Sequence, residues 1–320
     1  MSEAGLKAAA PSPRRTLNWA RLRGPVAIIT IFAAVFLSLQ VISPGSLSYF
    51  DINSLANGGA TLALASIGQT IIILTRGFDL SAGAVISLVN VTVASIPQET
   101  LGGQIVAALA GVAVGAAVGA FNGIFVGFLR LQSIVVTLAT MFLVRGLTLL
   151  IMPNPGGAVG GDLTTFLAGD AIPGLLPSSV VVLGLALAVW GVIKGSRFGT
   201  ALYAVGSDPE CAAAVGLPLA WTRFWAFTIG GAFYGAAGVF LSAQTGSADP
   251  LVGDPILLQS FAAVVLGGTS LAGGRGGAVG SVFGAYTLML LVNILLALDV
   301  SAYYSTVSKG LRCCWPRWSG

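Results

Sequence analysis

Apolar residues along this chain form nine long runs, separated by short polar or glycine-rich breaks. The runs cover residues 25–43, 55–75, 80–96, 104–128, 133–152, 178–194, 221–243, 256–267 and 277–298. About 20 mostly apolar residues cross the hydrocarbon core of a bilayer as a helix, so the pattern predicts an all-α polytopic membrane protein. The eighth run is short and ends in glycine-rich sequence, which predicts a broken or re-entrant helix.

Glycine recurs at every fourth position of the fourth run, and this spacing places all copies on one helical face. The positions are Gly111, Gly115, Gly119, Gly123 and Gly127. Small residues on one face let another helix approach closely, so we expect tight helix packing there. A mobile helix that lines a substrate path is the alternative interpretation. The same spacing recurs around the start of the ninth run, at Gly276, Gly280 and Gly284.

A polar break at 76–83 interrupts the apolar sequence between the second and third runs. Asp79 and Ser81 in this break can cap the helix that follows, because their oxygens accept free backbone N–H groups. A helix start at membrane depth carries partial positive charge and suits polar substrate groups. A cap in a short cytoplasmic turn is the alternative.

A second break, at 267–277, is glycine-rich. Irregular backbone at membrane depth persists only where protein or water satisfies it, so this passage also predicts a re-entrant or discontinuous helix. It is not a phosphate-binding loop, because the G-x-x-x-x-G-K-[ST] pattern is absent.

Composition then excludes several classes of protein. Of the 320 residues 56% are hydrophobic and 8% are charged, too few charges for a soluble domain of this size. The chain has no His and three Cys, which gives no metal-ligand pattern and no catalytic set. The 15 basic residues are scattered, which argues against nucleic-acid binding.

The positions of the charges predict a topology. The breaks 44–54, 97–103, 153–177 and 244–255 contain no Lys or Arg, whereas residues 1–24 and 194–223 contain several. By the positive-inside rule the N-terminal segment is cytoplasmic and those four breaks are external. Nine crossings would then end outside, yet the tail contains Lys309, Arg312 and Arg317.

The inward-facing segment 195–220 contains a short predicted helix. Asp208 can cap it, Pro209 and Glu210 suit its first turn, and Gly216 can end it before Pro218. So short a helix has no stability of its own in water, so it needs a partner surface.

This segment and four others resemble a known family. Glu210-Cys211-Ala212 followed by Gly216 resembles the E-A-A-x-x-x-G coupling loop of ATP-binding cassette (ABC) importer permeases, with Cys in place of the first Ala. The wider chain is similar to permeases of the ribose/xylose/galactose type. The stretches that carry this resemblance are GFDLSAG at 77–83, GAFNG at 119–123, VTLATM at 136–141, SRFG at 196–199 and AAVVLGGTSL at 262–271.

The resemblance implies a permease that is not itself an enzyme and that imports a monosaccharide or similar small polar solute across the bacterial inner (plasma) membrane. Its implied partners are ATP-binding cassette ATPase subunits, which hold ATP and magnesium, a periplasmic substrate-binding protein, and a second permease copy or paralogue. No cofactor is expected on this chain. By position, the translocation-path candidates are Asp79, Ser81 and Asn122, and the ATPase-coupling candidates are Gly206, Asp208, Glu210, Ala212 and Gly216.

The family usually has a tenth apolar helix, and this sequence departs from that pattern. We expect a permease domain over 25–311 and an atypical tail at 312–320 that reflects a truncated or frame-shifted last helix. An ion-coupled secondary transporter remains the alternative function, since that class also uses broken helices. Transporters of that class usually bury more ionisable groups than this chain, in which Asp79 and Arg145 are the few such residues.

Overall fold

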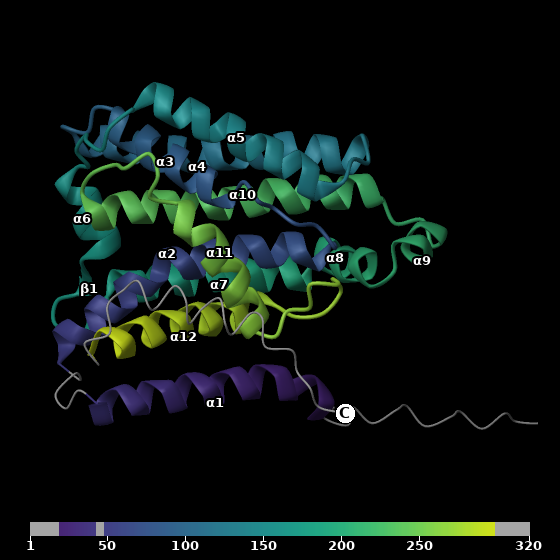
Figure 1. Ribbon diagram of the computed structural model, residues 1–320, viewed down its shortest axis with the longest axis horizontal. Coiled ribbons are helices and arrows are strands. Elements are labelled where there is room, and N and C mark those ends of the chain that lie inside the picture. The colour runs from purple at the N-terminus through teal and green to yellow at the C-terminus, as the bar shows by residue number, and fades with distance from the viewer. Residues whose placement is uncertain (1–18, 43–47, 298–320) are drawn as a thin grey trace, which may run out of the picture.

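The computed structural model describes residues 19–42 and 48–297 and shows a bundle of helices (Figure 1). Its elements are α1 (Trp19–Ile42), α2 (Tyr49–Leu74), α3 (Ala82–Ser95), α4 (Leu101–Gly123) with a π-helical turn (Ile124–Phe128), α5 (Ser133–Ile151), α6 (Gly161–Ala168), β1 (Asp170–Ile172), β2 (Leu176–Pro177), α7 (Ser178–Gly195), α8 (Arg197–Ser207), α9 (Pro209–Ala214), α10 (Leu219–Thr245), α11 (Asp254–Leu266) and α12 (Ala278–Ala297). All nine predicted apolar runs are helices, so the predicted all-α class is confirmed.

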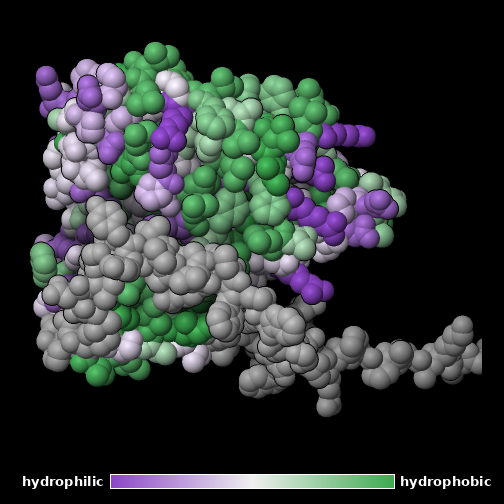
Figure 2. Space-filling model, viewed as in Figure 1, coloured by the Kyte–Doolittle hydropathy of each residue, from purple (hydrophilic) through white to green (hydrophobic). Residues whose placement is uncertain are grey.

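Six helices of the described part are long and apolar enough to cross a membrane: α2, α4 with its π-helical turn, α5, α7, α10 and α12. α2 lies at the centre, and most of its side chains are buried. The outer helices expose leucine, valine and phenylalanine side chains instead. Figure 2 shows hydrophobic residues over the middle of the visible face and hydrophilic ones mainly toward its two ends. This is the surface of a multi-pass membrane protein.

The predicted glycine stripe on α4 packs against α10. A Cβ atom added to Gly115 would lie 2.4 Å from the Gly231 carbonyl oxygen, and one added to Gly119 would lie 2.3 Å from the Phe227 oxygen. The second stripe packs α12 on α11, since a Cβ on Gly284 would lie 2.1 Å from the Ala263 oxygen. The tight-packing interpretation is therefore confirmed for the first stripe and for Gly280 and Gly284 of the second, whereas Gly276 lies in the turn before α12.

Among the helices of the predicted apolar runs, α3 and α11 are much shorter than the bilayer core. α3 and α11 have 14 and 13 residues, or about 20 Å each, against about 30 Å of hydrocarbon. Non-helical chain at 75–81 precedes α3, as the sequence predicts. Figure 1 shows α11 running obliquely within the bundle.

Non-helical chain lies on both sides of α11. The chain is non-helical over 246–253, before α11, except for an isolated bridge and turns. The glycine-rich passage 267–277 instead turns back beside the ends of α2 and α8, where the Gly274 N–H donates to the Leu74 carbonyl (3.1 Å). Positive φ angles at Gly268, Gly273, Gly274 and Gly276 permit this tight turn. The predicted interruption of the helical chain at 267–277 is therefore present, and it lies where α2 and α8 end.

Candidate functional site

The non-helical segment before α3 has backbone groups that a helix would otherwise satisfy, and side chains of α5 and α2 replace those bonds. The Phe78 and Leu80 N–H groups donate to the hydroxyls of Ser133 and Thr137, both at 3.1 Å. The Gln69 side-chain amide approaches the Asp79 carbonyl at 3.5 Å. Protein groups thus satisfy the irregular backbone, as a span at membrane depth requires.

The three translocation-path candidates form one hydrogen-bonded chain at the start of α3. Asp79 accepts from both the N–H and the hydroxyl of Ser81, at 2.8 and 2.6 Å. The Asn122 amide donates to the Ser81 hydroxyl at 3.0 Å, and the Thr140 hydroxyl donates to Asn122 at 2.7 Å. Asp79, Ser81 and Asn122 are all buried. The chain thereby ties α3 to α4 and α5.

The expected capping geometry is only partly present. Ser81 occupies the N-cap position of α3, yet its side chain accepts no hydrogen bond from a backbone N–H of the helix. Its hydroxyl donates to the Asp79 carboxylate instead, because a bond to a charged acceptor is stronger than one to a neutral group. The prediction of a Ser81 side-chain cap is wrong.

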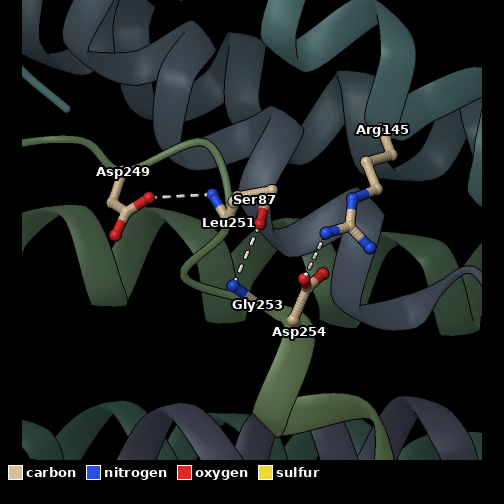
Figure 3. Close-up of polar contacts among 6 residues, drawn as sticks. All are labelled: Ser87, Arg145, Asp249, Leu251, Gly253 and Asp254. Carbon is tan, nitrogen blue, oxygen red and sulfur yellow. Dashed lines mark hydrogen bonds and ion pairs between the residues drawn. The ribbon is translucent and has the colours of Figure 1, made fainter. Parts of the chain in front are cut away.

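The start of α11 is held by α3 and α5 (Figure 3). The Gly253 N–H donates to the Ser87 hydroxyl at 2.9 Å, and Asp254 pairs with Arg145 of α5 at 2.9 Å. The Asp249 carboxylate accepts the Leu251 N–H at 2.8 Å within the preceding loop. Arg145, inside a predicted span, therefore has a charged partner from the break before α11.

The two half-length helices begin next to each other. A Cβ added to Gly253, just before α11, would lie 2.0 Å from the carbonyl oxygen of Gly83, in the first turn of α3. Both breaks in the helical backbone therefore lie side by side inside the bundle. This is the arrangement by which discontinuous helices bring their N-termini together within a membrane.

The short helix α9 has the cap predicted for it. The Asp208 carboxylate accepts the backbone N–H groups of Glu210 and Cys211, both at 3.0 Å. At the other end Gly216, with φ of 81°, donates to Ala213, and Leu217 donates to Ala212. These two bonds form a Schellman motif, for which a glycine in this conformation is favoured. Ala212 packs inward and Glu210 is exposed.

Titration of two groups on α9 follows from this cap. The pKa of the Asp208 carboxyl lies below its ordinary value, mainly because the Cys211 backbone N–H donates a hydrogen bond to it. Hydrogen bonding to Asp208, with the charge of that carboxylate, raises the pKa of the Cys211 thiol. At neutral pH Asp208 is therefore ionised and Cys211 is an exposed, protonated thiol.

Close backbone contacts join the base of α9 to the bundle. A Cβ on Gly206 would lie 1.7 Å from the Leu74 carbonyl oxygen and 2.6 Å from the Gly274 nitrogen. The Arg76 guanidinium donates to the carbonyls of Gly206, at 2.7 Å, and Ser207. The end of α2, the end of α8 and the turn at 267–277 thus form one packed unit, called the coupling base below.

The structure brings the coupling candidates together on α8 and α9 and the path candidates together at the start of α3. Sequence reasoning missed the α5 hydroxyls of Ser133, Thr137 and Thr140. Their spacing of four and three residues places them on one face of α5, and this was the available signal. Residues 19–42 and 48–297 hold no cluster of three His, Cys, Asp or Glu side chains that could bind a metal.

Comparisons with known proteins agree on one family. The family described as branched-chain amino acid transport system / permease component matches residues 52–311. The chain is 34% identical over 286 residues to the ribose import permease protein RbsC of Escherichia coli (strain K12), covering 87% of this chain and 88% of that protein.

Two further relatives are similar to this chain over most of their length. RbsC of Bacillus subtilis (strain 168) is 33% identical over 275 residues, which is 85% of each chain. The autoinducer 2 import system permease protein LsrC of Yersinia pseudotuberculosis serotype O:3 (strain YPIII) is 32% identical over 289 residues, covering 89% of this chain and 80% of that protein. No solved structure matches the chain.

Proposed function

This chain belongs to the branched-chain amino acid transport system / permease component family and is a permease of an ABC importer, and on that premise we propose that it translocates a monosaccharide or similar small polar solute. The relatives named above, which import ribose or autoinducer 2, support a sugar-like solute.

The observation that carries the proposal is α9, an exposed helix that is rigidly capped and joined to the bundle through the coupling base. Glu210, Cys211 and Val215 are exposed on it, so this helix has free surface for another protein. We propose that an ATP-binding cassette ATPase docks there and that its movement reaches α2 through Gly206 and Arg76.

The remaining partners and the orientation follow from the same proposal. ATP and magnesium are held by the ATPase, a periplasmic binding protein delivers the solute to the opposite end, and a second permease copy or paralogue completes the path. The α9 end is then cytoplasmic. Basic residues at that end support this orientation under the positive-inside rule: Arg76, Lys194, Arg197 and Arg275.

The path candidates also become part of the proposal. Asp79, Ser81 and Asn122 are buried in this conformation, so solute would reach them only if α3 moved relative to α4 and α5. We propose that their hydrogen-bonded chain fixes the start of α3 in the closed path.

Charge reversal on α9 tests the proposal. Glu210→Lys should lower solute uptake at least tenfold and weaken ATPase association, because it places a new charge on the docking surface. Glu99→Lys is the matched control, since Glu99 is exposed at the opposite end of the bundle. Uptake and ATPase co-purification are measured for both variants. Equal behaviour of the two would show that α9 is not the coupling surface.

A further inference from the structure

A cavity of about 400 Å³ lies among α2, α10, α11 and α12, in the half of the bundle away from α9. Its position follows from the break before α11. Since that helix begins part-way along the bundle, no helix of residues 19–42 or 48–297 fills the space beyond its first turns, and Ile256 and Gln259 of those turns line the cavity. The volume lies within the range of small-molecule sites.

One polar atom in the wall of this cavity has no partner among the described residues. Thr61 of α2 lines it and is 4% exposed, and its hydroxyl oxygen forms no hydrogen bond with the described residues. Most buried threonine hydroxyls here donate to the carbonyl four residues earlier, as Thr148 does to Val144 at 2.8 Å. A buried polar group without a partner costs free energy, so Thr61 is a group that a bound solute would satisfy.

Two amides complete the polar lining. Gln244 and Gln259 lie on the cavity wall, and neither side chain hydrogen-bonds to a described residue. Gln244 is exposed and Gln259 is half-buried, so polar groups run from the surface to the buried Thr61. Each amide both donates and accepts, which matches a solute hydroxyl.

Thr245 also lines the cavity, but its hydroxyl already donates to backbone carbonyls of Leu241 and Ser247. The remaining lining is apolar, including Leu62, Leu241 and Met289. All nine lining residues are uncharged. An amino acid would bring a carboxylate and an ammonium group into a site without counter-charges, at a high desolvation cost. A sugar has hydroxyls, which the two amides and the Thr61 hydroxyl can bind, and C–H faces, which the aliphatic side chains can contact.

We propose that this cavity, called the α11 cavity, is a binding site on the permease itself for a neutral polyhydroxylated solute, with Thr61, Gln244 and Gln259 as its hydrogen-bonding groups. The proposal rests on the proposed import function and adds a site and a selectivity to it. Solute would enter from the end opposite α9 and stop above the start of α11, which Ser87 and Arg145 hold in place.

Thiol accessibility tests the site on the full chain in its membrane. The three native cysteines, Cys211, Cys313 and Cys314, are replaced by Ser, and Thr61→Cys or Thr148→Cys is added. A water-soluble methanethiosulfonate reagent should modify the Thr61→Cys variant and leave the buried control unmodified. D-Ribose, D-xylose, D-galactose and L-leucine are each added at 100 mM. At least one sugar should slow the modification at least fivefold, and leucine should not.

Kinetics provide a second readout that separates the two proposals. In the complete transporter, Thr61→Val with Gln259→Leu should raise the KM for uptake about tenfold, while Thr148→Val leaves it unchanged. Wild-type uptake that does not depend on ATP would contradict the import function. ATP-dependent sugar uptake with an unchanged KM in the double variant, or without sugar protection of the thiol, would overturn the α11 cavity as a sugar site.

Discussion

Gly206 shows how a single residue connects α9 to the rest of the molecule. Its Cα faces the Leu74 carbonyl oxygen and the Gly274 nitrogen, which hydrogen-bond to each other, and a methyl group on Gly206 has no room against them. Backbone atoms cannot rotate away as a flexible side chain can. The contact is therefore a fixed joint between α8, α2 and the turn at 267–277.

Gly206→Ala should force α8 away from the end of α2 and from the turn at 267–277. We expect a loss of about 1–3 kcal/mol of stability, typical of overpacking, together with weaker coupling of ATP hydrolysis to uptake. Thermal unfolding of the purified protein and coupled uptake both measure the effect. Gly191→Ala is the control, because a Cβ there meets open space. A Gly206→Ala variant as stable and as active as the control would contradict the joint.

Cys211 reports on the cap of α9. Asp208→Asn keeps a capping side chain but removes the negative charge that raises the pKa of the thiol. The pKa of Cys211 should fall, so more thiolate is present and maleimide labelling at pH 8 becomes faster. Labelling rates from pH 6 to 9 measure this in a background where Cys313 and Cys314 are Ser. A rate profile unaffected by Asp208→Asn would show that the carboxylate does not control the thiol.

At the scale of helices and strands, much of the fold could be predicted because a helix produces a periodic pattern of residue types in the sequence. All nine apolar runs, the α4 glycine stripe and the capped α9 depend on neighbours within about four residues. The support of 77–81 by Ser133 and Thr137 depends on residues more than 50 positions away, and no local pattern encodes it. The break at 244–255 before α11 was predicted, but no local pattern encodes the contact of Gly253 with Gly83 at the start of α3.

The packing of α4 on α10 gives a test at this scale. Gly115→Ala should destabilise the protein by about 1–3 kcal/mol, since the new Cβ would lie 2.4 Å from the Gly231 oxygen. Gly184→Ala on α7, where a Cβ meets open space, should cost nothing measurable. Chemical unfolding in mild detergent compares the two. Equal stability would mean that α4 and α10 do not pack through this stripe.

The whole molecule has two ends with different chemistry, joined by α2. One end presents α9 on the coupling base, and the other opens toward the α11 cavity. α2 borders both, because Leu74 belongs to the coupling base and Thr61 lines the cavity. Under the proposed function, a displacement of α9 would reach the cavity through this one continuous helix. An importer is driven from one side of the membrane and loaded from the other, so it requires such a connection between its two ends.

Uptake into proteoliposomes tests this account most directly. The permease is reconstituted with its ATPase and binding protein, and labelled sugar uptake is measured with ATP, without ATP, and with an imposed proton or sodium gradient instead. The account predicts uptake only with ATP and the ATPase, and its loss with Glu210→Lys but not Glu99→Lys. Uptake driven by an ion gradient in the absence of ATP would contradict it and identify a secondary transporter.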